Sequence, residues 1–437
     1  MTFKGNDIIN ENYETFLLHQ FHDILPGSAI KKVYEDADIF LGKIFKDNKA
    51  IIKKHLTNLL SKENSPYFVF NPNAFTSNIP VEVNHECYVI KNVPSVGYQS
   101  FKLTHQTNHI KVSDRHLTNA YFDIKFNKYG EIISLYDKEH KKEIVKSGDT
   151  INKFIAYEDM PYAYDNWEIS PYYNQKKYPI NSVAKFAFIN EGDRRGFKIT
   201  RRYYKSKITQ YVYLYNGINR VDFVNQVDWK EKRQLLKIHF PMNVKCDQAR
   251  FDVQFGSIAR NTKPQNSYDE AKFEVSAHKW IDMSDGKFGV ALLNDSKYGY
   301  SVNGNDLSLT VLKSGSYPYE EATDICPEFK FALFPHTGDY QNDAVIKEAY
   351  AFNRPAFVYH NKNAKSYQNI KRSFISLASP NVIVETVKRA HLENAYIIRG
   401  YETSGKAHDV SLNVNVPFNK AYLADLMENN LKALPSK

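Results

Sequence analysis

Cysteine is scarce in this chain: Cys87, Cys246 and Cys326 are the only three among 437 residues. Because they are far apart and include no Cys-x-x-Cys pair, they support neither a disulfide framework nor a structural zinc knuckle. The sequence also lacks any run near the roughly 18 apolar residues that cross a membrane. Residues 2–7, TFKGND, do not form the apolar core of a signal peptide. These absences predict a cytoplasmic protein with no membrane partner.

Long basic segments are absent as well, although the net charge is +9. The lysines are scattered in short pairs such as Lys141-Lys142, which predicts a solvated surface and no nucleic-acid partner. Tyrosine and phenylalanine are abundant, with 31 and 28 residues. Together with Asn and Asp, these aromatic residues fit a protein that binds polyhydroxylated sugars. They fit a tyrosine-rich β-sandwich equally well, and composition does not choose between the two.

Helical spacing of apolar residues is confined to the beginning of the chain. Apolar residues recur at this spacing from residue 13 to residue 25 and predict an amphipathic helix. Pro26 and Gly27 follow directly and are expected to end it. The last turn of the predicted helix contains His22 and Asp23, whose side chains would project into a cleft. By itself, a lone His-Asp pair at a helix end is more often a satisfied structural pair than a metal site.

A second helix is expected after the Pro-Gly break. Ser28 is of a type that caps helices, and apolar residues recur at helical period from Ile30 to Leu60. We expect the two helices to pack as an antiparallel hairpin, the remnant of a helical bundle.

The residue pattern changes at Pro66. From there on, short stretches in which apolar and polar residues alternate are separated by Asn, Gly and Pro. Examples are residues 121–126, 211–215 and 410–414. This region of about 370 residues is too long for one β-sandwich, and it has no repeat of about 20 to 50 residues. The sequence therefore predicts a mainly β fold with a short N-terminal helical part, in which accessory β modules accompany a β-sandwich.

Residues 16–37, FLLHQFHDILPGSAIKKVYEDA, closely resemble the QFHDILPGSxIxxVYEDA segment of the glycoside hydrolases of family 38, the zinc-dependent α-mannosidases. Other segments resemble the same family in the same order along the chain. They include FVFNP at 68–72, VPSVGY at 93–98, GEIISLYDK at 130–138 and ALFPHTGD at 332–339. The resemblance covers nearly the whole chain, and the cytosolic and bacterial type is the most similar branch.

This resemblance implies a division of the chain into domains. Residues 1–62 would be the end of the middle helical-bundle domain, and residues 66–104 a small β domain. Residues 105–345 would form a large β-sandwich of the galactose-mutarotase-like kind, the C-terminal domain of family 38. Residues 346–437 would form a truncated terminal β module.

The resemblance also implies roles for single residues. His22 corresponds to a zinc ligand of the family, and Asp23 to an aspartate that holds substrate hydroxyls. Asp165 lies in a loop, YDNW at 164–167, that resembles the family's WDAWD loop near the active site, and we expect Asp165 to bind substrate. An aromatic corner in which Trp167 plugs the edge of the sandwich is an equally good interpretation of this loop.

The rest of the family's active site has no counterpart in this sequence. Family members hold zinc with a His-x-Asp pair near the start of a catalytic domain and with an aspartate that is also the nucleophile. No His-x-Asp triplet occurs in these 437 residues. We therefore expect no catalytic residue in this chain and no α-mannosidase turnover by the isolated chain.

The expected function is that of the C-terminal portion of a retaining α-mannosidase, which hydrolyses terminal α-linked mannose with the help of zinc. Its partners would be an α-mannoside and the missing N-terminal catalytic region, which could be a separate chain. A non-catalytic carbohydrate-binding or scaffold protein is the alternative.

Two further pairs of residues are expected to be structural. His336 and Asp339 lie in a strand-to-turn segment, which favours a structural role over a second metal site. Arg399 and Glu402, in a block that resembles the family's RLYE, are expected to form a buried ion pair that ties the last module to the sandwich.

Overall fold

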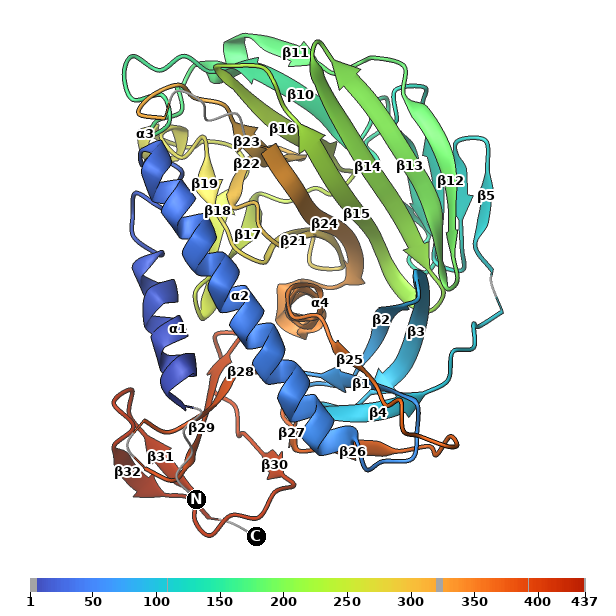
Figure 1. The fold of residues 1–437 in the computed structure, drawn as a ribbon. Helices are drawn as coiled ribbons and strands as arrows, with labels where there is room; N and C mark the ends of the chain where they lie inside the picture. Colours follow the sequence, from blue (N-terminus) through green and yellow to red (C-terminus); the bar gives the residue numbers. More distant parts are fainter. Residues whose placement is uncertain (1–5, 108, 320–324, 392, 436–437) are drawn as a thin grey trace.

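The computed structural model describes residues 6–107, 109–319, 325–391 and 393–435. Two helices, α1 (Asn6–Leu18) and α2 (Lys31–Leu60), lie side by side and run antiparallel, as predicted (Figure 1). The remainder is mainly β-strand, so the predicted fold class is confirmed. Within the described residues, no helix is long and apolar enough to cross a membrane.

The first helix is shorter than its apolar spacing predicts. α1 ends at Leu18 and gives way to turns, so His22 and Asp23 do not lie in a last helical turn. The Asp23 carbonyl oxygen accepts bonds from the Ser28 N–H at 3.3 Å and the Ser28 hydroxyl at 3.4 Å, whereas a helix would pair it with the fourth residue after it. Ser28 is therefore not the predicted cap of α2, whose N-cap is Ile30 without a side-chain hydrogen bond.

The end of α2 packs on a small antiparallel sheet that joins distant parts of the chain, in the strand order β25-β1-β4-β26. The strands are β1 (Tyr67–Asn71), β4 (Gly97–Phe101), β25 (Phe357–His360) and β26 (Lys371–Ser373). Leu60 of α2 is buried in one cluster with Phe68 and Tyr98 of this sheet. The sheet thus combines residues from the predicted small β domain and from the predicted terminal module.

The hairpin of β2 (Ser77–Val83) and β3 (Glu86–Val93) lies between this small sheet and the large β-sandwich (Figure 1). Its Val89 backbone N–H donates to the buried Asp193 carboxylate at 2.9 Å. Cys87 packs there with Tyr213 and Tyr215 of the sandwich. The hairpin therefore connects the two parts of the fold.

The large β-sandwich is built from antiparallel sheets. One sheet contains, in spatial order, β12 (Lys185–Glu191), β13 (Arg194–Tyr203), β14 (Ser206–Tyr215), β15 (Ile218–Asp228), β24 (Ile325–Thr337), β21 (Phe288–Asn294), β20 (Trp280–Ser284), β17 (Gln248–Val253) and β18 (Gly256–Asn261). A second contains β11 (Lys177–Pro179), β10 (Lys153–Glu158), β16 (Gln234–Pro241), β23 (Asp306–Lys313), β22 (Gly299–Asn303) and β19 (Val275–Ser276). A third contains β5 (Lys111–Ser113), β6 (His116–Thr118), β7 (Phe122–Phe126), β8 (Ile132–Asp137) and β9 (Lys142–Glu143).

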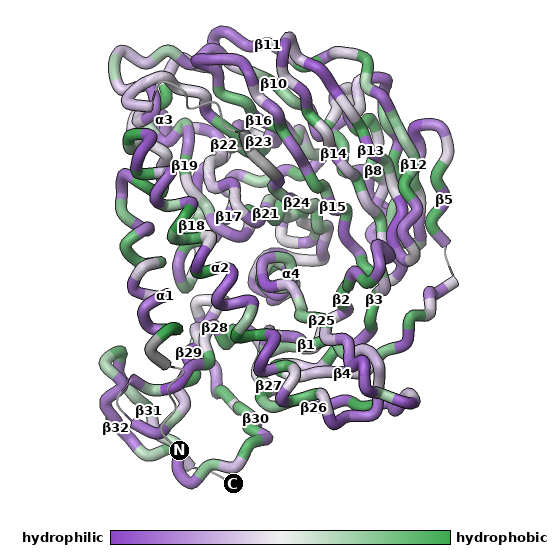
Figure 2. The backbone as a smooth tube through the Cα atoms, viewed as in Figure 1, coloured by the Kyte–Doolittle hydropathy of each residue, from purple (hydrophilic) through white to green (hydrophobic). Residues whose placement is uncertain are grey.

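One continuous apolar core lies within the sandwich. It includes Phe154 of β10, Phe223 of β15 and Leu309 of β23, which are at most 1% exposed. Successive side chains of a strand point to opposite faces of its sheet, so every second residue contributes to the core. Figure 2 shows the resulting alternation of hydrophobic and hydrophilic residues along the long strands.

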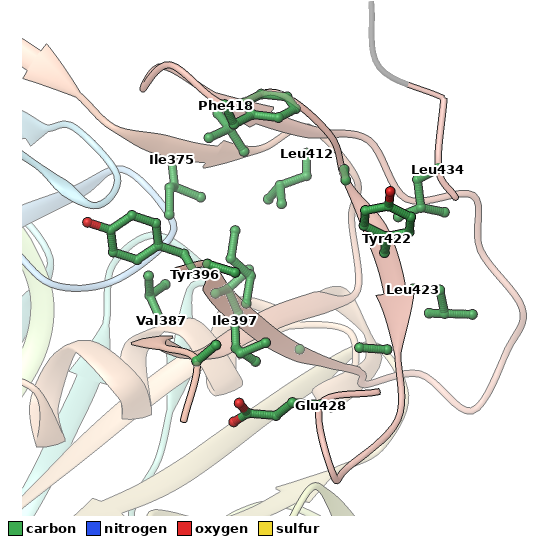
Figure 3. A pocket seen from close by; sticks show the side chains of 18 of the residues that line it. Ile375, Val387, Tyr396, Ile397, Leu412, Phe418, Tyr422, Leu423, Glu428 and Leu434 are labelled. Atoms are coloured by element: carbon green, nitrogen blue, oxygen red, sulfur yellow. The ribbon is translucent and has the colours of Figure 1, made fainter. Parts of the chain in front are cut away.

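The last part of the chain begins with α4 (Ala344–Asn353), which packs Val345 and Ala349 against the face of the sandwich. Its later strands pair two by two: β27 (Ile375–Leu377) with β30 (Leu412–Val414), β28 (Val382–Arg389) with β29 (Tyr396–Glu402), and β31 (Tyr422–Ala424) with β32 (Asn430–Ala433). They surround an open hollow of about 1970 Å³. Figure 3 shows Ile375, Ile397 and Leu412 around this hollow.

Candidate functional site

The His22–Asp23 pair lies in the turn that connects α1 and α2. The His22 Nε2 is 3.5 Å from the Asp23 Oδ2, and the side chains are 70% and 35% exposed. The imidazole of His22 is therefore accessible to a ligand. Adjacent residues of a turn place both side chains on the same stretch of surface, as the predicted site requires.

The two oxygens of the Asp23 carboxylate differ in their surroundings. Oδ1 is buried and has no hydrogen-bond partner among the described residues. A buried acceptor without a partner costs free energy, so such atoms are rare in folded proteins. The side chain as a whole is 35% exposed, so a hydroxyl group on the turn can approach the carboxylate, although Oδ1 itself is covered by protein.

Tyr34, in the first turns of α2, holds the turn from the other side. Its hydroxyl donates to the Asp23 carbonyl oxygen at 3.1 Å. It also accepts a bond from the Ala29 backbone N–H at 2.8 Å. One side chain therefore links both ends of the turn. In the sequence, Tyr34 is an apolar position of the second helix and part of the motif at 16–37, and nothing there indicates the role of its hydroxyl.

Asp165 is buried, and both of its carboxylate oxygens are engaged. Oδ1 accepts the backbone N–H groups of Ser316 at 2.9 Å and Tyr317 at 2.6 Å, and Oδ2 accepts the Ser316 hydroxyl at 2.8 Å. Burial raises the pKa of the Asp165 carboxyl, but the hydrogen bonds from Ser316 and Tyr317 outweigh burial and bring the pKa below its ordinary value. Asp165 is thus an ionised anchor for the loop at 314–319.

The loop that carries Asp165 is connected to the His22–Asp23 turn through the loop at 314–319. The Asn166 side chain donates to the Tyr319 carbonyl oxygen at 3.3 Å. The ring of Tyr319 stacks on the ring of Tyr34, with centroids 6.0 Å apart and planes 14° apart. The structure therefore connects Asp165 to Asp23 indirectly, through Tyr319 and Tyr34.

Trp167 does not plug the edge of the sandwich. It is 57% exposed, and the neighbouring Tyr164 is 58% exposed. The buried members of the loop are the polar residues Asp165 and Asn166. The aromatic-corner interpretation of Trp167 is therefore wrong, because the polar side chains hold this loop and the rings face outward.

His336 and Asp339 each bond to another residue of the fold. His336 is 3% exposed and bonds Asp282 at 2.8 Å, whereas Asp339 accepts the Gln341 N–H at 2.9 Å at the start of a short helical turn. Their predicted structural role is confirmed.

Arg399 and Glu402 do not form the predicted ion pair. Glu402 instead accepts bonds from the backbone N–H groups of residues 404–406 and from the Ser404 hydroxyl. Residues three apart in β29 point to opposite faces of the strand, so the side chains of Arg399 and Glu402 diverge. The prediction of a buried Arg-Glu tie is wrong for that reason.

The described residues do not by themselves fit a catalytic zinc ion. Such an ion is bound by about three protein ligands from His, Cys, Asp or Glu. Within the described ranges, no group of three or more of these side chains could hold a metal. His22 and Asp23 together supply an imidazole and a carboxylate, which is an incomplete set.

Three family models match the chain. Residues 4–59 match "Alpha mannosidase middle domain", residues 117–321 match "Glycosyl hydrolases family 38 C-terminal domain", and residues 381–437 match "Glycosyl hydrolases family 38 C-terminal beta sandwich domain". These matches occur in the order in which the structure places the helical part, the large sandwich and the terminal strands.

Curated relatives and solved structures agree with the family models. The chain is 30% identical to Alpha-mannosidase 2C1 of Homo sapiens over 439 residues, which is 95% of this chain and 42% of the relative. It is 29% identical to Alpha-mannosidase of Saccharomyces cerevisiae over 450 residues, which is 96% of this chain and 40% of the relative. The fold is similar to that of an alpha-mannosidase from Enterococcus faecalis, with a TM-score of 0.81, 13% identity and coverage of 99% of this chain and 62% of that one. The chain thus spans less than half the length of these curated relatives.

Proposed function

We propose that this chain, which belongs to glycosyl hydrolase family 38 as a C-terminal portion, works as part of a zinc-dependent α-mannosidase that removes terminal α-linked mannose with retention of configuration. The observation that carries this proposal is the His22–Asp23 turn. It presents an accessible imidazole beside a buried carboxylate oxygen that lacks a partner among the described residues. The names of the relatives support the same activity.

His22 contributes one imidazole to a metal site that the rest of the enzyme completes. Zinc, when bound, would polarise the sugar hydroxyls that it contacts. Because His22 and Asp23 are too few to hold zinc, we assign no reaction step to a metal on this chain alone.

Asp23 binds the sugar through its partly exposed carboxylate, in which Oδ1 has no hydrogen-bond partner among the described residues. A carboxylate oxygen accepts hydroxyl donors in short, charge-assisted hydrogen bonds. Contacts of this kind strengthen as a glycoside ring distorts toward its transition state. Asp23 therefore orients the sugar, and the nucleophile and the acid lie in a catalytic region outside this chain.

A surface for that catalytic region is available on the helical part. Large apolar side chains are exposed on α1, on α2 and on the turn between them, among them Leu17, Phe21, Leu25, Ile39 and Phe45. Exposed apolar patches of this kind are typical of interaction surfaces. We propose that they contact the catalytic region, either within a longer protein or as a separate chain.

The proposal is tested by joining the chain to the catalytic region of a relative. His22→Ala should lower zinc occupancy, and added zinc should restore part of the activity. Asp23→Ala should leave zinc bound and lower kcat/KM about 100-fold, because several kcal/mol of transition-state binding are lost. His55→Ala, a change at an exposed histidine of α2, is the matched control. Equal zinc loss in both site variants, or full activity in either, contradicts the assignment of these residues.

A further inference from the structure

The contacts of the Asp165 loop with the 314–319 loop, and of that loop with α2, form a continuous connection to the candidate site. We infer that Asp165, Tyr319 and Tyr34 act as a strut that fixes the orientation of the His22–Asp23 turn. Asp165 is then a positioning residue that acts from a distance and does not touch the sugar. This inference rests on the proposed function for its catalytic consequence, but its structural part can be measured separately.

The far end of the strut is rigid. The Asp165 carboxylate holds Ser316 and Tyr317 with three hydrogen bonds, and the Asn166 backbone N–H donates to the Tyr317 carbonyl oxygen at 3.0 Å. The two loops approach so closely that a Cβ on Gly315 would lie 1.9 Å from the Asn166 side-chain oxygen. Only glycine fits at this position, so the two loops interlock.

The use of both Asp165 oxygens argues against a direct substrate contact. The residue is 8% exposed, and the nearest guanidinium nitrogen, Arg233 Nε, lies 3.8 Å from Oδ2. Binding a sugar hydroxyl would require Asp165 to give up the bonds that hold residues 316 and 317. The carboxylate is therefore suited to holding a loop and poorly suited to exchanging ligands.

The end of the strut at Tyr34 supports a turn that has no regular helical hydrogen bonding. α1 ends at Leu18, and the backbone hydrogen bonds from there to Ser28 are 3.0 to 3.3 Å long and mostly of the turn type. Tyr34 adds a link from α2 to the carbonyl of Asp23, the residue that carries the unpaired Oδ1. Because the Tyr34 ring stacks on Tyr319, the position of its hydroxyl depends on the 314–319 loop.

Hydrogen exchange of the 437-residue chain tests the strut without any need for catalysis. The reporters are the backbone amides of Ser28 and Ala29, which bond the Asp23 carbonyl and the Tyr34 hydroxyl. Tyr34→Phe removes the hydroxyl and should speed their exchange about fivefold, as expected for one lost hydrogen bond. Tyr319→Ala and Asp165→Asn, which touch neither amide, should speed it by a similar factor.

The matched control is Tyr319→Phe, which keeps the stacked ring and should leave the exchange unchanged. Thermal unfolding of each variant shows whether the whole chain remains folded. Unchanged exchange at residues 28 and 29 in folded Tyr319→Ala and Asp165→Asn would overturn the strut.

The catalytic consequence is measured in the chain joined to a catalytic region. Tyr319→Ala should lower kcat about tenfold with little change in KM, and Tyr319→Phe should restore it, because a displaced turn misplaces groups that act in the transition state. Normal kcat in Tyr319→Ala despite faster exchange would overturn the positioning role. If even the unaltered joined protein lacks activity on a mannoside, the proposed function fails, and the exchange experiment still decides the strut.

Discussion

At the scale of single residues, His336 has the structural role that the sequence predicts. Its position in a strand-to-turn segment predicts a structural role, and the ring lies 2.8 Å from Asp282 of β20 inside the sandwich. The identity of the partner could not be predicted, because Asp282 is 54 residues away and meets His336 only after β20, β21 and β24 pair. Local sequence indicates the kind of role, and strand pairing selects the partner.

The His336–Asp282 pair should make stability depend on pH. Burial lowers the pKa of His336, but the hydrogen bond and charge of Asp282 raise it more, so the pKa lies above its ordinary value of 6.5. The stabilisation is therefore fully present below pH 6.5 and is lost as pH rises through the folded pKa. Urea unfolding of the unaltered chain should show this decline, and His336→Gln and Asp282→Asn should flatten it. His55→Gln is the control, and an equal slope in all variants would contradict this origin.

The candidate site illustrates the other limit of residue-scale prediction. The motif at 16–37 indicates His22 and Asp23. Tyr34 lies in the same motif, but neither its contact with Asp23 nor the part of Tyr319 could be predicted, because hydrogen bonding and ring stacking between segments leave no local pattern in a sequence. The substrate-binding role of Asp165 stays a prediction, and its bonds to Ser316 and Tyr317 favour the positioning role that we propose.

At the scale of elements, α1 shows what apolar periodicity determines and what it leaves open. The spacing predicts a helix up to residue 25, but α1 ends at Leu18. Periodicity marks which residues are apolar, while the end of a helix depends on where its carbonyl groups find partners. In the turn after α1, the side chains of Ser28 and Tyr34 donate hydrogen bonds to the Asp23 carbonyl oxygen. These contacts come from α2 and from beyond the Pro-Gly break, so the spacing of apolar residues could not reveal them.

The pairing of β13 with β14 depends on one glycine. A Cβ on Gly196 would lie 1.8 Å from the Val212 carbonyl oxygen on the neighbouring strand. Gly196→Ala should lower the free energy of unfolding by about 2 kcal/mol, because backbone must move to relieve the clash. Gly256→Ala is the control, since no described atom lies within 4 Å of its Cβ position. Denaturant unfolding of both variants measures the difference, and equal stability would show that the strand pair adjusts freely.

At the scale of the whole molecule, we expect the chain to carry binding groups without the groups that break a glycosidic bond. A retaining glycosidase needs a nucleophilic carboxylate and an acid about 5 to 5.5 Å apart. We expect the isolated chain to show no turnover of an aryl α-mannoside, with or without zinc. The assay compares the chain with a heat-treated sample, and turnover that disappears in His22→Ala would contradict the prediction.

The small sheet at the end of α2 has a consequence for synthesis of the chain. β1 and β4 can pair as soon as Phe101 has left the ribosome, but β25 begins only at Phe357. At about 5 to 20 residues per second, the interval lasts on the order of tens of seconds. Throughout it, the edge of β1 that β25 will cover is open to other nascent chains. Polysomes that make this protein should therefore depend on chaperones that bind residues 67–101 until the sandwich has emerged.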